Sequence, residues 1–458
     1  MQVRRTDRSE AMGTASIWRL LFRFSGPAIV AMMVASSYNL VDAIFVGRLG
    51  AEALAALTVA FPLMMVFMAI GGATGMGAAS LISRRLGAGD RKGADRGAGV
   101  TITLAILLGA LMTAITLPNL EALLRLFGAT ESVLPFAKSY MFILASFAVL
   151  NFFPMVINSI VRAEGNPLLA SGTMILSAVT NIILDPILIF GLGPIPAMGI
   201  AGAAIATVIG RGVGALIMLI YLASPKTSYR FRLSYFLPSL KILAEIYRVG
   251  MASMVRSTAG SVMMVLANRI TVSFGVTPLA IRGVLFRAAS FAFMPCMGLG
   301  QGVLPIIGYN FGANQKDRIG EVTIKASLAS FLWGVLCWII VMVFSTQVMS
   351  LFNTEAEFLL EGSSALRIFS IAFFAIGIQM ILSFFFQGIG RGFPSLVLAS
   401  ARQIIFLLPG LLIFPRLFGL TGVWMSFPTA DVLSLILTLI WAGIEFRRQG
   451  IRFRLRYH

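Results

Sequence analysis

The sequence predicts an all-α polytopic membrane protein with twelve transmembrane helices in two pseudo-twofold-related six-helix lobes. Three observations predict this fold: the composition, the recurrence of long uncharged stretches, and an internal repeat. Of the 458 residues, 58% are hydrophobic and only 12% are charged, and the mean hydropathy is +0.92. A soluble protein has roughly a quarter of its residues charged. Most of the outer surface of this chain therefore does not face water.

Uncharged stretches recur along the whole chain at the length that a spanning helix needs, which is about 20 apolar residues. No stretch alternates polar and apolar residues as a β-barrel strand does. The first is expected to be a retained helix, because no small-residue cleavage site follows a short apolar core. Apolar periodicity and helix breakers place the spans at 17–46, 53–83, 98–118, 133–160, 168–190, 198–223, 242–273, 279–309, 324–345, 360–386, 395–414 and 420–444.

Basic residues are concentrated in alternate connections between these spans. The two termini, the even-numbered connections and the span ends next to them hold 23 lysines and arginines, from Arg4 to Arg456, whereas the odd-numbered connections hold only 3, namely Arg48, Arg125 and Arg416. Because positively charged loops stay in the cytoplasm, we expect both termini there, in a multi-pass protein of a prokaryotic plasma membrane. The net charge of +18 is spread over these loops, so nucleic acid is not an expected partner.

Residues typical of catalysis and metal binding are nearly absent. The only histidine is His458, the last residue, and Cys296 and Cys337 lie in apolar stretches with no metal or disulfide spacing. No G-x-x-x-x-G-K-[ST] run is present, so an ATPase motor within the chain is not expected. We therefore expect no enzyme activity and no cofactor beyond a coupling ion.

The second half of the chain repeats the first at a spacing of 225 residues. The motif LGAG at 86–89 corresponds to FGAN at 311–314, and Leu126-Phe127 corresponds to Leu351-Phe352. Later pairs drift slightly, as Gly199 and Gly419 do at a spacing of 220. Two halves in the same orientation imply a twofold axis along the membrane normal, with substrate handled between the halves.

The repeat also predicts the domain boundaries. We expect residues 1–223 to form an N-terminal six-helix lobe and residues 242–458 to form a C-terminal six-helix lobe. The long basic connection 224–241 is expected to be a cytoplasmic linker between them.

Acidic side chains inside the spans of the first lobe mark a candidate site. An ionisable group in a spanning helix costs roughly 2.5–3.5 kcal/mol on insertion scales, so its presence requires a reason. Asp42 lies in the first span, Asn181 and Asp185 lie one turn apart in the fifth, and Thr207 lies in the sixth. At about 1.5 Å of rise per residue, these four side chains share one layer in the outer third of the lobe.

The four side chains are suited to a small cation. Two carboxylates, an amide and a hydroxyl are hard oxygen ligands, as Na⁺ requires. Two neighbouring carboxylates also disfavour each other's charge, so that one can hold a proton near neutral pH. The pattern leaves H⁺ and Na⁺ open. It also leaves open a structural role, in which a membrane aspartate only bonds a neighbouring helix.

Four motifs extend this picture: Tyr38-Asn39-Leu40-Val41-Asp42, Asn181-x-x-x-Asp185-Pro186, and the connections RRLGAGD and RAEGNP. They resemble the multidrug and toxic compound extrusion (MATE) family, particularly its archaeal and DinF-like branch, over nearly the whole chain. The resemblance implies that Asp42, Asn181, Asp185 and Thr207 form the cation or proton site.

The resemblance also implies a moving helix and a drug pocket. It identifies Pro27 as the hinge at which the first helix bends, since proline removes a backbone hydrogen bond. It further implies that Tyr38, Asn158 and Met174 line the substrate pocket of the first lobe.

The second half departs from this symmetry, because the position 225 residues after Asp42 is Ala267. Its spans instead hold several arginines. Arg269 and Arg282 are expected to reach the outer interface, whereas the deeper Arg256 and Arg287 would suit an anionic or zwitterionic substrate. The structural alternative is an ion pair with Asp431. In all, five arginines in the spans of the second half are candidates for these roles: Arg256, Arg269, Arg282, Arg287 and Arg402. By the repeat, Asp431 corresponds to Arg211, so a pair between the lobes is also open.

These features predict a secondary antiporter that exports organic compounds in exchange for H⁺ or Na⁺. The alternative is a flippase or exporter of an anionic or lipid-linked substrate that uses Arg256 and Arg287. A channel or a non-transporting receptor is disfavoured by the paired halves. The expected partners are the lipid bilayer and small organic substrates, while the natural substrate, the coupling ion and the oligomeric state stay open.

Overall fold

The computed structural model describes residues 7–451, apart from the side chains of residues 39 and 40. Within this range the chain is helical, with one isolated bridge between Leu192 and Ile195. The terminal basic residues counted above lie partly outside the described residues: Arg4, Arg5, Arg452, Arg454, Arg456 and also His458.

Within the described residues, nine helices precede the central connection 224–241. The short helix η1 lies within this connection, and the remaining helices follow it. The first group is α1 (Asp7–Thr14), α2 (Ile17–Gly47), α3 (Ala51–Gly87), α4 (Arg91–Thr116), α5 (Leu120–Leu126), α6 (Leu134–Ser146), α7 (Ala148–Ala163), α8 (Pro167–Phe190) and α9 (Ile200–Ala223). The second is η1 (Leu233–Phe236), α10 (Leu240–Val272), α11 (Val276–Gly312), α12 (Lys316–Ser350), α13 (Ala356–Ser370), α14 (Phe373–Gly388), α15 (Gly392–Ser400), η2 (Ala401–Leu407) and α16 (Leu408–Gln449).

The predicted fold class is confirmed. Within residues 7–451, ten helical runs are long and apolar enough to cross a membrane, and α6 with α7 adds an eleventh, bent by 55°. The run from Gly392 to Gln449 has 58 residues, about three bilayer thicknesses at ~1.5 Å per residue. It is broken at Gly419, where φ is 59° and ψ is −141°, a conformation that favours glycine. Counting this run as two spans gives twelve.

The repeat extends to irregular points of the backbone. Phe147, at the bend between α6 and α7, has φ −106° and ψ 30°, and Ala372, 225 residues later, has φ −101° and ψ 16°. Asn119 before α5 has φ −104° and ψ 11°, and Phe344 within α12 has φ −111° and ψ 22°. Since the breaks recur at the same register, the two lobes share one internal architecture.

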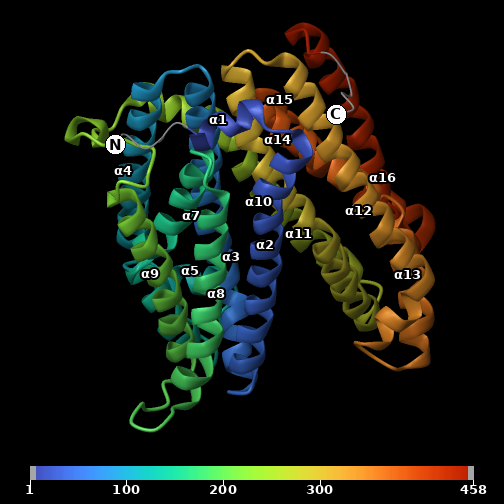
Figure 1. Ribbon diagram of the computed structural model, residues 1–458. Helices are drawn as coiled ribbons and strands as arrows, with labels where there is room; N and C mark the ends of the chain where they lie inside the picture. The colour runs from blue at the N-terminus through green and yellow to red at the C-terminus, as the bar shows by residue number, and fades with distance from the viewer. Residues whose placement is uncertain (1–6, 452–458) are drawn as a thin grey trace.

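The lobes form a V that is closed at the end holding α1, α14 and α15 and open at the other end (Figure 1). The two lobes are in contact through α2 against α11 and through α3 against α10. A Cβ added to Gly77 of α3 would lie 2.1 Å from the carbonyl oxygen of Ile246 of α10, and one added to Gly250 would lie 2.1 Å from that of Ala73. The backbones of α3 and α10 therefore touch at these glycines.

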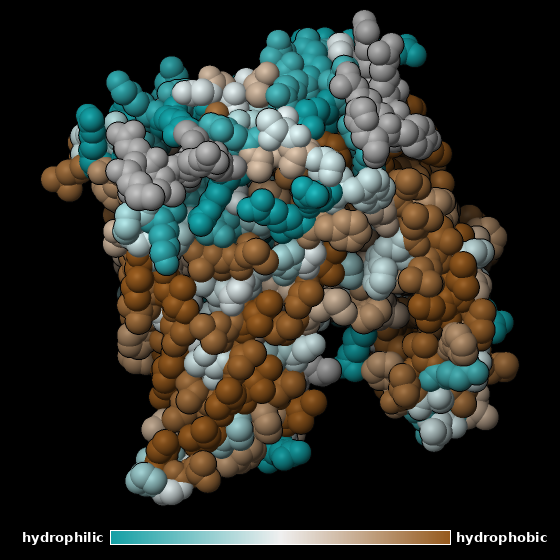
Figure 2. Space-filling view, viewed as in Figure 1, coloured by the Kyte–Doolittle hydropathy of each residue, from teal (hydrophilic) through white to brown (hydrophobic). Residues whose placement is uncertain are grey.

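The hydrophilic and hydrophobic parts of the surface are separated along the direction from the closed end of the V to its open end. Figure 2 shows hydrophilic side chains gathered over the closed end and a wide hydrophobic belt below them on both lobes. This is the surface of a protein whose flanks face lipid. Large apolar side chains that are exposed on the helices include Phe22, Leu107, Leu332 and Ile440.

The central connection is fixed to the first lobe. The hydroxyl of Thr103 donates to the carbonyl oxygen of Phe236 at 2.8 Å, and the hydroxyl of Tyr229 donates to that of Ile160 at 2.6 Å. Glu164 is fully buried and accepts from Thr227 Oγ1 at 3.1 Å and from the Ser228 N–H at 2.9 Å.

Several predicted boundaries were wrong for physical reasons. The span predicted at 133–160 is the bent pair α6 and α7, because Phe147 leaves the helical conformation. The span predicted at 324–345 begins at Lys316, since its polar first turns are helical but lie outside the apolar stretch. Helices α1 and α5 were not predicted, because they are too short to give an apolar period.

Candidate functional site

The clearest polar cluster inside the first lobe lies between α8 and α9. Asn181 and Asp185 are four residues apart on one face of α8, and Asn181 Nδ2 donates to Asp185 Oδ1 at 3.1 Å. The same nitrogen lies 3.3 Å from Thr207 Oγ1 on α9. The two helices approach closely at Gly210 of α9, which has no side chain. A Cβ added there would lie 2.6 Å from the carbonyl oxygen of Ser177 on α8.

Asp42 completes the cluster from a third helix. It lies on α2, which packs along α8, and its carboxylate interacts electrostatically with that of Asp185. Asp185 is 0% exposed. The structure thus brings Asp42, Asn181, Asp185 and Thr207 into one buried region of the first lobe.

Three acceptor oxygens in this region are buried and lack a hydrogen-bond donor among the described residues: Asp42 Oδ1, Asn181 Oδ1 and Asp185 Oδ2. A buried acceptor without a donor is costly. All three atoms are hard ligands of the kind that hold a proton or a small cation. Within residues 7–451, no group of three or more His, Cys, Asp or Glu side chains is placed to bind a metal ion.

Two further residues of the region were missed from the sequence. Tyr140 on α6 is buried and interacts electrostatically with Asp42, Asp185 and Arg211. Arg211 lies four residues after Thr207 on α9, which places it on the same helix face. The spacing of Arg211 from Thr207 was a usable signal, whereas nothing in the sequence distinguished Tyr140 from other aromatic residues of the spans.

The residues assigned to a drug pocket come from three helices around the same lobe. Tyr38 on α2 is half-buried and interacts electrostatically with Tyr140. Asn158 on α7 is buried, and its Oδ1 accepts from Thr173 Oγ1 on α8 at 3.0 Å. Met174, the next residue on α8, is half-buried. Tyr38 is therefore linked to the acidic cluster through Tyr140, while Asn158 is bound to α8 beside Met174.

Pro27 lies inside α2, which the structure shows as one continuous helix from Ile17 to Gly47. Its ring leaves the carbonyl oxygen four residues earlier without its usual donor. That carbonyl belongs to Arg23. The proline is therefore a weak point in an otherwise regular helix, close to the contact between the lobes at Ser25 and Ile29.

The two deep arginines of the second lobe have different surroundings. Arg256 on α10 lies over the Phe384 ring at 6.0 Å and donates from Nη1 to Ser383 Oγ at 3.4 Å, while its Nη2 is buried without an acceptor among the described residues. Arg287 on α11 is exposed and lies over the Phe352 ring at 5.6 Å. Only Arg256 therefore presents an unpaired buried donor.

One expectation about the second lobe was wrong, and one of two open alternatives for Asp431 is confirmed. Arg282 does not reach the interface: it is 6% exposed and donates from Nη2 to the Met264 carbonyl oxygen at 3.3 Å. A backbone carbonyl within the lobe satisfies this donor. Asp431 pairs with Arg402, whose Nε lies 2.5 Å from Asp431 Oδ1, and not with Arg211. The pair lies within the second lobe and does not join the two lobes.

Comparison with known proteins gives the family. The MatE family model matches residues 27–187 and again residues 251–412, once in each lobe. The chain belongs to the MatE family. It is therefore a membrane transporter of the MATE type and not an enzyme.

Individual relatives cover almost the whole chain. It is 28% identical over 430 residues to the multidrug export protein MepA of Staphylococcus haemolyticus and 29% identical over 429 residues to MepA of Staphylococcus aureus, with 93% of each chain covered in both cases. Assignment to the archaeal and DinF-like branch stays a prediction.

Solved structures give the same result. A MOP superfamily transporter from Pyrococcus furiosus, described as having a binding pocket of reversed polarity, matches with a TM-score of 0.91 and 29% identity over 97% of this chain and 99% of that one. An outward-facing multidrug resistance MATE transporter matches with the same TM-score, identity and coverage.

Proposed function

We propose that this transporter is a secondary antiporter that exports organic compounds in exchange for H⁺ or Na⁺. The observation that supports the proposal most directly is the set of three buried acceptor oxygens on Asp42, Asn181 and Asp185. They gather where two carboxylates interact within an apolar lobe. Such a cluster is stable only when a proton or small cation compensates the buried charge. Thr207 supplies the fourth ligand through its bond to Asn181.

The protein lies in the plasma membrane of a prokaryote in this proposal, with both termini in the cytoplasm. The bias of lysine and arginine supports that orientation. Among the described residues, the closed end holds Arg84 and Arg85 in the last turn of α3, Arg91 at the start of α4 and Arg391 just before α15. The V is therefore closed toward the cytoplasm and open outward, which is the state that can receive an external cation.

Transport follows from exchange between this state and its inward-open counterpart. A cation enters from outside and neutralises one carboxylate of the pair Asp42 and Asp185. Helix α2 then bends at Pro27 and reshapes the pocket around Tyr38, Asn158 and Met174, so that substrate leaves. The lobes 1–223 and 242–458 next rock about the linker 224–241, which separates backbones such as Gly77 and Ile246. Driving energy is about 2.3 kcal/mol per charge for each 100 mV across the membrane.

The substrate class follows from the relatives, because those named MepA are multidrug export proteins. We therefore propose small organic compounds of several chemical types as substrates. No ATP-driven step is required, because the ion gradient supplies the energy.

A second candidate function has one specific observation in its favour. The unpaired, buried Nη2 of Arg256 would suit an anionic substrate group, as in a flippase or exporter of a lipid-linked compound. Arg287 contributes less in this alternative, because it is exposed and lies over Phe352. This function requires Arg256 and tolerates loss of Asp42.

The deciding experiment is ethidium efflux from proteoliposomes under a proton gradient and, separately, a sodium gradient. Asp185→Asn removes one carboxylate of the cluster, and Glu357→Gln is the control, because Glu357 is an exposed carboxylate on α13. The antiporter predicts efflux under at least one gradient, lost in Asp185→Asn and kept in Glu357→Gln. Gradient-driven efflux that survives in Asp185→Asn contradicts the coupling site. No efflux with folded wild-type protein, together with export of an anionic lipid that Arg256→Gln abolishes, supports the alternative.

A further inference from the structure

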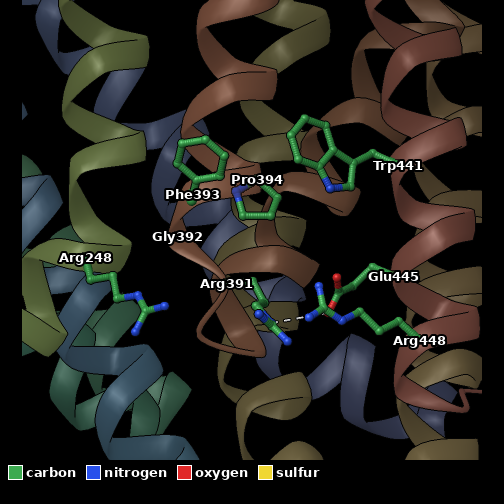
Figure 3. Close-up of a pocket in the computed structure, with 8 residues that line it drawn as sticks. All are labelled: Arg248, Arg391, Gly392, Phe393, Pro394, Trp441, Glu445 and Arg448. Atoms are coloured by element: carbon green, nitrogen blue, oxygen red, sulfur yellow. Dashed lines mark ion pairs between the residues drawn. The ribbon is translucent and has the colours of Figure 1, made fainter.

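A pocket of about 300 Å³ lies in the second lobe, away from the cation cluster. Its walls come from the first turns of α10, the connection before α15 and the last turns of α16. Its lining residues are Arg248, Arg391, Gly392, Phe393, Pro394, Trp441, Glu445 and Arg448. Figure 3 shows the three guanidinium groups pointing toward its middle, with Phe393, Pro394 and Trp441 gathered on one side.

The charges of the pocket are only partly compensated. Arg391 Nε lies 3.3 Å from Glu445 Oε1, and Glu445 is also bound by Gln449 Nε2 at 2.6 Å. Three arginines against one glutamate leave a formal charge of +2 in the lining. Arginine clusters of this kind bind phosphate groups through paired N–H donors.

The apolar wall lies on the membrane side of these charges. Arg448 follows Trp441 by two turns of α16, or about 10 Å along the helix toward its end at the membrane surface. Phe393 follows Arg391 into the membrane on α15 and is 68% exposed. Tryptophan and phenylalanine beside arginine are typical of the boundary between headgroups and acyl chains.

The pocket is preformed. A Cβ added to Gly392 would lie 1.5 Å from the carbonyl oxygen of Arg248, so the start of α15 rests directly on the backbone of α10. Because this contact holds the backbones of two walls together, a ligand need not order the backbone when it binds.

We propose that this pocket binds the phosphodiester headgroup of an anionic glycerophospholipid from the cytoplasmic leaflet. The arginines hold the phosphate, and Trp441, Pro394 and Phe393 contact the glycerol and the first acyl carbons. The division of the pocket into a charged end and an apolar, lipid-facing end favours a lipid over a soluble phosphate. The choice of leaflet rests on the orientation given under the proposed function, whereas the site itself does not.

The position of the pocket allows a bound headgroup to affect transport. Arg248 lies between Ile246 and Gly250, whose backbones touch Gly77 and Ala73 across the closed end of the V. A lipid that ties Arg248 to α16 therefore acts on the helix that forms the contact between the lobes.

Brominated lipids test the proposal through Trp441. The chain has 5 tryptophans, so the Trp441 signal is the part of the fluorescence that Trp441→Phe removes. The protein is reconstituted with phosphatidylcholine and increasing fractions of phosphatidylglycerol, with bromine on the acyl chains of one lipid at a time. We expect brominated phosphatidylglycerol to quench Trp441 at lower mole fraction than brominated phosphatidylcholine.

Charge variants identify the origin of this preference. Arg248→Gln and Arg448→Gln each reduce it about fivefold, the effect of one basic residue near an anionic surface. Arg447→Gln is the matched control, because Arg447 is the exposed neighbour of Arg448 and does not line the pocket. Preference that persists in both pocket variants, or equal quenching by both lipids in the wild type, overturns the proposal.

Competition by a soluble phosphate is the last part of the experiment. Glycerol phosphate at millimolar concentration is added to the wild-type liposomes. Unchanged quenching by brominated phosphatidylglycerol supports a lipid site, whereas relief of that quenching shows that the pocket takes a soluble phosphate and overturns the lipid assignment. The wild-type comparisons need no arginine substitution, so a variant that fails to fold leaves them decisive. They also do not depend on ethidium efflux, so failure of the lipid site and failure of the antiporter are distinguishable.

Discussion

Asn181 Nδ2 lies 3.1 Å from Asp185 Oδ1 on α8 and 3.3 Å from Thr207 Oγ1 on α9. One amide thus joins a buried carboxylate to a neighbouring helix, and the other oxygen of that carboxylate is left without a donor. The amide group fixes the side chains while leaving acceptor capacity free. This is the arrangement expected of a site that must bind and release a cation without refolding.

Thr207→Val tests the role of the hydroxyl. Valine has nearly the same shape but offers no oxygen, so one ligand of the proposed site is lost while packing is kept. We expect the concentration of H⁺ or Na⁺ that gives half-maximal efflux to rise roughly tenfold, the equivalent of about 1.4 kcal/mol, with the unfolding temperature nearly unchanged. Thr207→Ser, which restores the oxygen, is the control. Equal ion dependence in the wild type and Thr207→Val would remove this residue from the site.

The ion pair between Arg402 and Asp431 is predicted to stabilise the second lobe. Asp431 is buried, and its Oδ1 lies 2.5 Å from Arg402 Nε. Asp431→Asn leaves the guanidinium of Arg402 without a counter-charge, which costs about 1–3 kcal/mol, because the Arg402 side chain is 30% exposed and solvent screens part of its charge. Chemical or thermal unfolding of the purified protein measures this loss.

A double variant separates pairing from other contacts. Arg402→Gln combined with Asp431→Asn removes both charges and is expected to be more stable than Asp431→Asn alone. A double variant as unstable as the sum of the single ones would show that the two residues act independently.

Glu164 is predicted to make stability depend on pH. It lies in the connection between α7 and α8, where burial raises its pKa to about 7 from 4.5 and hydrogen bonds from Tyr221, Ser228 and Thr227 oppose the rise. Between these two pH values the folded state binds more protons than the unfolded state. The free energy of unfolding contributed by Glu164 is therefore fully present below about pH 4.5 and is lost as the pH rises to about 7.

The variant Glu164→Gln isolates this contribution, because glutamine does not titrate. We expect the unfolding temperature of the wild type to fall from pH 5 to pH 7.5 more steeply than that of Glu164→Gln. Equal slopes for the two proteins would mean that Glu164 does not titrate in this window.

Gly77→Ala is predicted to weaken the closed end of the V. Its new Cβ would lie 2.1 Å from the carbonyl oxygen of Ile246, and neither backbone can move without separating the lobes. We expect spin labels placed on α3 and α10 at the closed end of the V to move apart, and efflux to fall severalfold. Gly443→Ala is the control, because an added Cβ there meets nothing within 4 Å. Unchanged label distances in Gly77→Ala would show that this contact does not hold the state.

Features that depend on composition or on a regular spacing of residues could be predicted from the sequence alone. The twelve spans, the two lobes and the register of the repeat follow from apolar length and from motifs such as LGAG and FGAN. The pairing of Asn181 with Asp185 follows from a spacing of one helical turn. Each of these is local or periodic, so no knowledge of packing is required.

Features set by packing between distant helices could not be predicted. Phe147 has an ordinary sequence environment, yet the chain bends there by 55°. The burial of Arg282 depends on a carbonyl of α10, and the partner of Asp431 depends on how η2 faces α16. Tyr140 belongs to the acidic cluster only because α6 lies against it.

The most direct test of the central claim is to run the transporter backwards. Proteoliposomes with equal ion concentrations on both sides receive a gradient of ethidium, and internal pH and ²²Na⁺ content are followed. Exchange predicts that ethidium movement drives H⁺ or Na⁺ in the opposite direction, and that Asp42→Asn abolishes this ion movement. Ethidium transport with no counter-movement of either ion, or ion movement that persists in Asp42→Asn, would contradict an antiporter coupled through this cluster.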